Sequence, residues 1–460
     1  MTSEPSVAGA GSAPSGKPKK REHWASPLGA ILAAAGSAIG LGNIWRFPYL
    51  AGENGGGAFV LIYLGLVFTI GLSVLVAELA IGRLAQANAV TAFHRLGKPR
   101  WAVIGWLGVA SALIILSFYS IVAGWTVAYA SKMAAGAFTA EGTQAADVFN
   151  AFVAQPLTPL LFGAGFMTVT AVVIWRGVSR GIERLSLVLM PLLLLLLVAL
   201  MVRALTLPGA LDGVAFLFAP DFGAVDFDTI NAALGQAFFS LSLGLGAMLT
   251  YGSYMNSAHN VGRSAGAIVA LDTGIAISAG LVVLPAVFAF GLEPGAGPGL
   301  VFVTLPEIFA QMPLGQVFGT LFFVLLAFAA LTSTVALMEP VCAFLIGARG
   351  MRRHTAAVLT GMVAFVLGIP SSWSLGMWSG VTLFDMTIFD IADYVTAKLM
   401  LPLGGLLIAV FTGWVLGGRI EASLAPQGGG GVLVAGWRLV VRFLAPVAIA
   451  WILVSGLLGG

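Results

Sequence analysis

Long apolar blocks alternate with short polar stretches over most of this chain. About 20 apolar residues cross a bilayer as one helix, and eleven blocks of that length can be counted. They lie near residues 27–49, 58–82, 101–134, 157–175, 183–205, 229–255, 263–292, 314–346, 355–372, 388–416 and 437–458. We therefore expect an all-α polytopic membrane protein with 11 transmembrane helices. A further apolar stretch at 300–311 contains Pro306 and Glu307, and it is predicted to be a re-entrant or extracellular helix.

The first block differs from a plain membrane anchor. It carries Gly36, Gly40 and Gly42, followed by Asn43 and Arg46. Glycine costs about 1 kcal/mol relative to alanine in a helix interior, and a charge at membrane depth costs roughly 2.5–3.5 kcal/mol on insertion scales. Non-helical backbone is tolerated at that depth where it is buried in protein or lines a wet cavity. The pattern therefore predicts a helix that breaks in mid-membrane to line a polar cavity.

A second interruption occurs five blocks later. Residues 236–246, Gln-Ala-Phe-Phe-Ser-Leu-Ser-Leu-Gly-Leu-Gly, place two glycines, two serines and a glutamine in the middle of the sixth block. Paired interruptions in corresponding halves indicate inverted repeats with a binding site between them. Bare N–H groups at half-helix starts favour an anion, whereas unwound carbonyl groups suit a cation such as Na⁺. Small residues that only let helices pack closely are the alternative explanation.

Composition places the chain among polytopic membrane proteins. Of its 460 residues 59% are hydrophobic and 9% are charged, and the formal net charge is only +3, so we expect no nucleic-acid partner. Residues 1–20 are polar and lack the apolar core of a signal peptide, which predicts a disordered cytoplasmic tail. The single cysteine, Cys342, can form no intrachain disulfide and is predicted to be a buried apolar residue.

The basic residues predict the orientation of the chain. With the N-terminus inside, 18 of the 22 Lys and Arg residues fall in cytoplasmic segments, while the alternate loops hold mostly Asp and Glu. This bias follows the positive-inside rule. Eleven crossings then place the C-terminus outside. We expect a multi-pass protein of the plasma (inner) membrane, with residues 21–458 as a single transporter domain.

Several motifs resemble those of the neurotransmitter:sodium symporter family, in particular its bacterial amino-acid transporters. They are residues 36–57, 236–246, 329–334 (Ala-Ala-Leu-Thr-Ser-Thr), 21–25 (Arg-Glu-His-Trp-Ala) and 181–184 (Gly-Ile-Glu-Arg). The resemblance implies a LeuT-like fold with broken helices 1 and 6. Two inverted five-helix repeats would lie at about 27–205 and 229–416, followed by helix 11 at about 437–458. It also implies sodium-coupled import of a neutral, hydrophobic L-amino acid by alternating access.

The same resemblance implies two sodium sites. The first would use the Ala38 carbonyl with Asn43, Ser240 and Asp272. Asp272 also stands out on chemical grounds, because an intramembrane carboxylate is functional by default. The second site would use the carbonyl groups of Gly36, Ile39 and Ala329 and the hydroxyl groups of Thr332 and Ser333. On chemistry alone, those two hydroxyl groups could instead bond to carbonyls of their own helix turn.

One neighbouring position bears on chloride. The resemblance places Ala276 where a bacterial member carries a glutamate that takes the place of the chloride of animal members. Tyr63 and Gln236 match other members of that cluster. We hypothesise that Asp272 supplies the missing negative charge, so that chloride is not required.

Gly40 indicates which kind of substrate fits. Monoamine transporters of the family carry an acidic residue there, whereas glycine leaves room for a substrate with its own carboxylate. By resemblance, that carboxylate would meet the N–H groups of Leu41 and Gly42 and the Tyr119 hydroxyl. The amine would meet carbonyl groups of Ala38, Phe239 and Ser242, with Ser240 beside them. The side-chain pocket would consist of Ile115, Phe239, Leu245, Ser333 and Leu337, an apolar lining that suits a neutral amino acid.

Two gates follow from the resemblance. Arg46 and Asp393 would close the outer side above Phe239, with Asp390 as the competing acid. On the inner side Arg21, Trp24 and Tyr254 fit the family, but the acidic partner of its inner gate falls at Gly347 here.

Two further positions carry predictions about the helices. Gly181 followed by Pro191 resembles the unwinding motif of the family's fifth helix, with an ordinary proline kink as the alternative. Glu78 is predicted to hydrogen-bond the broken backbone of the first helix.

Other function classes are less compatible with the sequence. No enzyme is expected, because His23, His94, His259 and His354 lie at predicted cytoplasmic ends without metal-ligand spacing. An ion channel, which needs a continuous polar pore, and a transporter-like amino-acid receptor without net transport remain as alternatives. The expected partners are the lipid bilayer and a small amino acid, and the expected state is a monomer or a weak dimer.

Overall fold

The computed structural model describes residues 22–139, 142–256, 259–292, 299–424 and 431–458. The predicted tail at 1–20 and Arg21 lie outside these described residues. Within them the chain is helical, and β pairing is limited to isolated bridges, Gly56 with Pro220 and Leu383 with Met386. The prediction of an all-α protein is confirmed.

Nine helices of the described chain are long and apolar enough to cross a membrane. They are Gly57–Ala85, Pro99–Ala134, Thr158–Trp175, Val178–Leu205, Val261–Ala289, Gly315–Arg349, Arg353–Ser374, Ile388–Leu416 and Gly431–Gly456. The bent pair of Pro27–Ala38 and Gly42–Glu53 makes ten if it counts as one span. The predicted sixth span is divided between α11 (Phe227–Ser240) and α12 (Ala247–Gly252), which have 14 and 6 residues. The total of eleven therefore remains a prediction.

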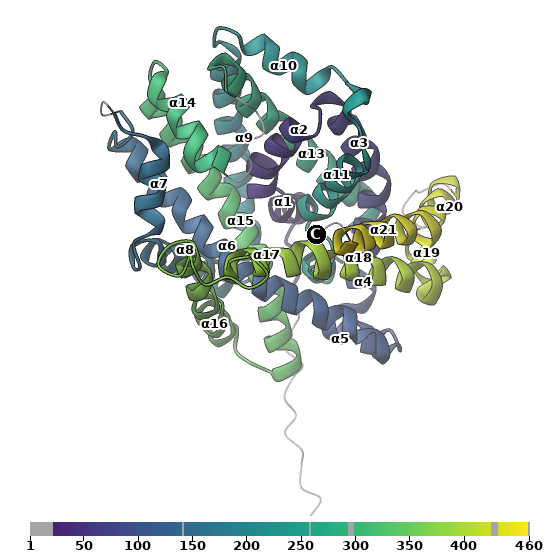
Figure 1. Ribbon diagram of the computed structural model, residues 1–460. Coiled ribbons are helices and arrows are strands. Elements are labelled where there is room, and N and C mark those ends of the chain that lie inside the picture. The colour runs from purple at the N-terminus through teal and green to yellow at the C-terminus, as the bar shows by residue number, and fades with distance from the viewer. Residues whose placement is uncertain (1–21, 140–141, 257–258, 293–298, 425–430, 459–460) are drawn as a thin grey trace, which may run out of the picture.

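Most spans consist of several helical elements (Figure 1). Besides α11 and α12, they contain α1 (Pro27–Ala38), η1 (Gly42–Arg46), α2 (Phe47–Glu53), α3 (Gly57–Leu66), η2 (Val67–Gly71), α4 (Leu72–Ala85), α6 (Ala102–Ala134), α8 (Thr158–Trp175), η4 (Val178–Glu183), α9 (Arg184–Leu205), α13 (Val261–Ala289), α15 (Gly315–Arg349), α16 (Arg353–Ser374), α17 (Ile388–Asp393), η7 (Tyr394–Met400), α18 (Leu401–Val410), η8 (Phe411–Leu416), α20 (Gly431–Leu439), η10 (Val440–Leu444) and α21 (Ala445–Leu458).

Shorter elements connect the spans. They are α5 (Ala89–Arg95), η3 (Pro99–Trp101), α7 (Ala145–Val153), α10 (Ala210–Phe218), η5 (Phe222–Ala224), η6 (Leu300–Thr304), α14 (Leu305–Gln311) and α19 (Gly418–Leu424). η6 and α14 together form a short apolar helix, Leu300–Gln311, where the sequence predicted one that does not span.

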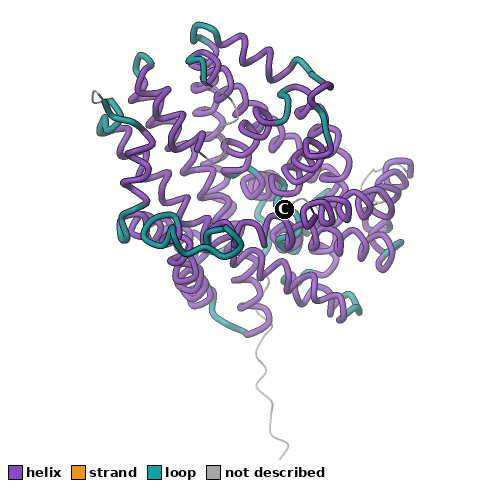
Figure 2. Tube along the Cα trace, viewed as in Figure 1, coloured by secondary structure: helices purple, strands orange, loops and turns teal. Residues whose placement is uncertain are grey.

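Two long helices form the scaffold of the bundle. α6 and α15 have 33 and 35 residues and pack along each other, and both contact α8 and α16. α1 lies against α13 and α15. Figure 1 shows α1, α2 and α11 in the middle of the bundle, and Figure 2 shows loop segments in the interior as well as at the ends. The interrupted helices are therefore enclosed by continuous ones, as broken backbone at membrane depth requires.

The bundle has two ends that differ in their side chains. The end that we call the N-terminal face carries residues 22–26 and Arg353 at the start of α16, and it lies at the bottom of Figure 1. The end that we call the opposite face carries Arg46 and Asp393, which line one vestibule with Glu53 at the end of α2. α1 begins at the N-terminal face, and α2 ends near the opposite face.

Glycines let the helices approach closely at one scaffold contact. A Cβ added at Gly124 of α6 would lie 2.5 Å from the backbone nitrogen of Gly163 in α8. Gly165, two residues further along α8, is exposed and has open space around it. The first glycine is therefore needed for packing, whereas the second is not.

We predict that Gly124→Ala lowers the melting temperature of the purified protein in detergent, because overpacking a close contact costs about 1–3 kcal/mol. The matched control Gly165→Ala should melt at or above the wild-type temperature, because alanine is the better helix former by about 1 kcal/mol. Equal melting of Gly124→Ala and wild type would contradict this contact.

Candidate functional site

The first break separates α1 from η1. α1 ends at Ala38, and Ile39 takes an extended conformation with φ −77° and ψ 96°. The Gly40 N–H donates to Asn43 Oδ1 at 3.3 Å, which holds the turn. A Cβ at Gly40 would overlap the Ser333 hydroxyl, and one at Gly42 would lie 2.8 Å from the Phe239 ring. Both glycines are required because neighbouring side chains approach the backbone here.

The second break, residues 241–246, separates α11 from α12. Ser242, Gly244 and Gly246 have φ values of 53°, 79° and 69°, in the left-handed region that favours glycine. The Gly244 N–H donates to Glu78 Oε1 in α4 at 2.7 Å. The prediction that Glu78 bonds the first break is therefore wrong. It reaches the second break instead, because α4 packs against α12.

Two hydrogen bonds join the breaks to each other. Gln236 Nε2 donates to the Gly42 carbonyl at 2.9 Å, and the Ser242 hydroxyl donates to the Ser37 carbonyl at 2.9 Å. Buried backbone groups outside regular helix need partners of this kind. Gln236 lies in α11 and Ser37 in α1, so these bonds tie the two interrupted spans together beside their breaks.

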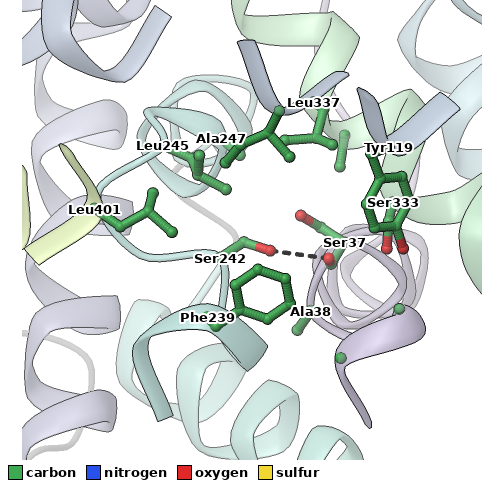
Figure 3. Close-up of a pocket in the computed structure, with 14 residues that line it drawn as sticks. Ser37, Ala38, Tyr119, Phe239, Ser242, Leu245, Ala247, Ser333, Leu337 and Leu401 are labelled. Carbon is green, nitrogen blue, oxygen red and sulfur yellow. Dashed lines mark hydrogen bonds between the residues drawn. The ribbon is translucent and has the colours of Figure 1, made fainter. Parts of the chain in front are cut away.

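A cavity of about 40 Å³ lies between the two breaks and the scaffold helices (Figure 3). None of its lining residues carries a charge. They are Ser37, Ala38, Gly40, Gly42, Ile115, Tyr119, Phe239, Ser242, Leu245, Ala247, Ser333, Ala336, Leu337 and Leu401.

Nine of the eleven residues that the sequence predicted for substrate contact line this cavity, and Leu41 and Ser240 do not. The Leu41 N–H donates to the Tyr119 hydroxyl at 3.0 Å. Ala247, Ala336 and Leu401 could not be singled out in the sequence, because small and aliphatic residues are common throughout the spans. Ser37 is the polar lining residue that sequence reasoning missed.

The predicted ligands of the first sodium site are bonded to one another. Asn43 Nδ2 lies 2.7 Å from Asp272 Oδ1 and 3.1 Å from Ser240 Oγ. Ser240 Oγ donates to Asp272 Oδ2 at 2.7 Å, and the Tyr63 hydroxyl lies 3.4 Å from the same oxygen. The Asp272 side chain is 0% exposed. We call these four residues the Asp272 cluster.

The Asp272 cluster carries a negative charge with neutral partners. The ion pairs within 4 Å among the described residues are Arg353–Glu22, Arg353–Glu339 and Arg438–Glu421, so none of them involves Asp272. A buried carboxylate is costly unless it is paired or coordinates a metal ion. The carboxylate and hydroxyl oxygens at this place therefore fit a small cation, and Ala38 lines the adjoining cavity. The Asn43 amide would have to turn over to add its oxygen, because its nitrogen faces Asp272 and its Oδ1 accepts from Gly40.

Four of the five residues predicted for the second sodium site also lie together. The Thr332 hydroxyl donates to the Ala329 carbonyl at 2.9 Å and lies 3.4 Å from the Ile39 carbonyl. A Cβ at Gly36 would lie 3.3 Å from Thr332 Cβ. The Ser333 hydroxyl, the fifth group, lies beside Gly40 on the cavity side. Thr332 thus makes the bond within its own turn that the sequence left as the alternative, while also facing the first break.

A vestibule of about 500 Å³ opens towards the opposite face and contains both predicted residues of the outer gate. Arg46 and Asp393 line it, but they do not form one of the three ion pairs. Arg46 instead holds its guanidinium 4.9 Å from the centre of the Phe239 ring. Phe239 lines both the vestibule and the cavity, so this ring separates the two spaces.

At the N-terminal face an ion-pair network centred on Glu339, which the sequence analysis missed, lies beside a hollow of about 740 Å³ lined by Tyr254 and Arg353. Glu339 of α15 is 0% exposed; it accepts a hydrogen bond from the Tyr254 hydroxyl at 2.5 Å and from Arg353 Nη2 at 2.7 Å. Arg353 Nη1 also lies 3.3 Å from Glu22. Trp24 is buried against the Tyr254 ring, and its Nε1 donates a hydrogen bond to the Tyr251 carbonyl at 3.0 Å. Trp24 and Tyr254, which the resemblance assigned to the inner gate, both lie in this network.

The acidic member of this network could have been found by the argument used for Asp272. Glu339 is likewise a carboxylate inside an apolar span. The resemblance instead placed the acidic position of the inner gate at Gly347. The predicted partner Arg21 lies outside the described residues.

The segment from Gly181 to Pro191 is helical, so the unwinding that the resemblance implied is not present in this conformation. η4 is a π-helix that contains Gly181, and Pro191 lies inside α9. Glu183 accepts hydrogen bonds from the backbone N–H groups of Ala25 and Ser26 at 2.7 and 3.0 Å. The first described residues are therefore tied to the start of the fifth span.

Comparisons with known proteins agree with this geometry. A model of the sodium:neurotransmitter symporter family matches residues 21–142 and 160–459. The uncharacterized sodium-dependent transporter YhdH of Bacillus subtilis is 41% identical over 94% of this chain and 96% of its own length. The human sodium- and chloride-dependent taurine transporter is 28% identical over 88% of this chain and 73% of its own length.

A solved structure supports the same relationship. MhsT in complex with L-phenylalanine matches with a TM-score of 0.88 and 46% identity, over 95% of this chain and 100% of that one. This match confirms the predicted LeuT-like fold.

We predict that Glu339→Gln loosens the N-terminal face, because it removes the buried charge opposite Arg353. The reporter is Ala336→Cys, a cavity-lining position one turn away, in a Cys342→Ala background. An impermeant maleimide added from the side of the N-terminal face should label it roughly tenfold faster, the factor for a shift of ~1.4 kcal/mol in the opening equilibrium.

The matched control for this experiment is Glu421→Gln, which breaks the more exposed Arg438–Glu421 pair. That change should leave the labelling rate as it is. Unchanged labelling in Glu339→Gln would contradict a closing role for the network.

Proposed function

Because the chain belongs to the sodium:neurotransmitter symporter family, we propose that it couples the inward movement of Na⁺ to the import of a neutral, hydrophobic L-amino acid by alternating access. One observation carries the proposal. Asn43 belongs to both parts of the site. Its amide nitrogen donates a hydrogen bond to Asp272, and its Oδ1 accepts one from the N–H of Gly40, which lines the cavity. A cation held by the cluster and a substrate in the cavity would therefore share one turn of backbone.

The first sodium ion would be held by Asp272, Asn43, Ser240 and the Ala38 carbonyl. The charge balance supports this assignment, since the buried Asp272 carboxylate has only neutral hydrogen-bond partners among the described residues. The second would be held by the Gly36, Ile39 and Ala329 carbonyls with Thr332 and Ser333, where no formal charge is present. The first ion would therefore be the one whose binding depends on a carboxylate.

The cavity supports the substrate class. Leu41 N–H donates to the Tyr119 oxygen, which leaves the hydrogen of the Tyr119 hydroxyl for a substrate carboxylate. The N–H groups at the start of η1 favour an anion for the same reason as any helix N-terminus. The far walls are formed by aliphatic residues such as Ile115, Leu245 and Leu337. An uncharged, apolar side chain is the complement of these walls.

The two faces support alternating access. The basic residues favour a cytoplasmic N-terminal face, where Glu339 of α15 pairs with Arg353 of α16. At the opposite face, Arg46 and Asp393 lie along an open vestibule without pairing. The arrangement corresponds to an outward-facing conformation in which the Phe239 ring already lies between the vestibule and the cavity. Pairing of Arg46 with Asp393 above that ring would close the outer side.

A receptor without transport and an ion channel are the competing functions. The discriminating experiment is uptake of labelled amino acids into proteoliposomes with an inward Na⁺ gradient, with competition by all twenty amino acids to identify the substrate. Accumulation that disappears when choline replaces Na⁺ supports the symporter. Binding without accumulation would favour the receptor, and Na⁺ flux without amino-acid movement would favour the channel.

We predict that Asp272→Ala weakens sodium-dependent amino-acid binding by about 100-fold or more, because removing one member of a buried charged site costs about 3–5 kcal/mol. The measurement is the Na⁺ concentration for half-maximal amino-acid binding to purified protein. The exposed acid Asp212 in α10 provides the control, and Asp212→Ala should bind like wild type. Normal affinity in Asp272→Ala would remove this carboxylate from the sodium site.

We also predict that chloride is dispensable, because Asp272 places a fixed negative charge beside the first sodium site while Ala276 contributes none. Uptake in sodium chloride and in sodium gluconate should proceed at the same rate. Loss of uptake in gluconate would show that Asp272 does not replace the anion.

A further inference from the structure

The Ser37 hydroxyl is buried in the cavity without a partner. Ser37 is 3% exposed and lines the cavity, and its Oγ has no hydrogen-bond partner among the described residues. The Ser37 carbonyl, by contrast, accepts from the Ser242 hydroxyl at 2.9 Å. A buried hydroxyl left without a partner costs about 1–3 kcal/mol. Something that enters the cavity is therefore expected to bond this oxygen.

Many hydroxyl groups in the spans are satisfied by their own helix, although Thr273 and Thr412, which do not line the cavity, also have no partner among the described residues. Ser111 bonds the Leu107 carbonyl at 2.7 Å, and Thr126 bonds the Ala123 carbonyl at 2.6 Å. This back-bonding is the usual state of serine and threonine in a membrane helix. Ser37 differs in that its Oγ lines the cavity and makes no bond to its own turn. Its side chain is free to serve a ligand.

The place of Ser37 shows which part of a substrate it would meet. It precedes Ala38, whose carbonyl would bind the substrate amine. Figure 3 shows Ser37 across the open centre of the cavity from Leu245 and Leu401, with Ser242 beside it. A group next to the amine-bearing carbon, on the substrate's β-carbon, is the part that this hydroxyl would reach first.

We propose that Ser37 is a specificity-determining residue that hydrogen-bonds a hydroxyl group on the β-carbon of the substrate. The cavity would then accept threonine as well as aliphatic amino acids, although its remaining walls are mostly apolar. This inference rests on the proposed amino-acid transport, and it adds a polar preference to the hydrophobic one. Threonine and valine have nearly the same shape, so they isolate the contribution of this one hydrogen bond.

The test measures the dissociation constants of threonine and valine in saturating Na⁺ for wild type and Ser37→Ala. We expect Ser37→Ala to weaken threonine relative to valine by about 5- to 10-fold, the effect of one net hydrogen bond. Ser37→Thr keeps a hydroxyl and should restore the wild-type ratio. Ser111→Ala is the control, because it removes a buried hydroxyl that is bonded within its own helix.

The possible failures are distinguishable. A threonine-to-valine ratio that is the same in wild type and Ser37→Ala, with sodium-dependent binding intact in both, would overturn the role of Ser37 alone. Wild-type protein that binds other amino acids but neither of these two would overturn it as well. Absence of sodium-dependent binding of any amino acid to wild type would overturn both this inference and the proposed function.

Discussion

A carboxylate buried in an apolar helix bundle is the constraint on which the rest of this structure depends. Asp272 is fully buried, and its hydrogen-bond partners are neutral. Such a group stays ionised only if its surroundings supply hydrogen bonds and a cation. The broken first helix brings Asn43 to it, and the end of α11 brings Ser240. Both helices stop being regular beside this charge, and the cavity lies in the space between the two breaks.

Hydrogen bonds between different spans hold the two breaks in place, rather than the intrinsic helix propensity of their residues. Gln236 and Ser242 bond carbonyl groups of the first broken segment, and Glu78 bonds an N–H of the second. The scaffold helices α6 and α15 remain continuous. The bundle therefore combines two continuous scaffold helices with two interrupted spans, the first and the sixth. The N-terminal face with its ion-pair network and the open vestibule lie at the two ends of those interrupted spans, so closing one end while opening the other is the motion that the geometry suggests.

Much of this arrangement could be predicted from the sequence, because membrane burial makes polar residues conspicuous. Gly40, Asn43 and Asp272 were found as exceptions in apolar blocks, and the structure brings them together. The partners of such groups were harder to predict. Glu78 was assigned to the wrong break because its choice depends on how α4 packs against α12. Arg353 reaches Glu339 across 14 residues of chain through a turn whose shape no local pattern encodes. Ser37 could not be recognised in the sequence, because only the structure shows that its hydroxyl group has no hydrogen-bond partner among the described residues.

The central claim is that the Asp272 cluster and the cavity form one coupled site. Coupling of two ligands is reciprocal, so the factor by which one changes the affinity of the other must be the same in both directions. The most direct measurement is the affinity for a bound amino acid as a function of Na⁺ concentration, together with the affinity for Na⁺ with and without that amino acid. The account predicts that each ligand tightens the other by the same factor. An amino-acid affinity that does not change with Na⁺ would contradict it.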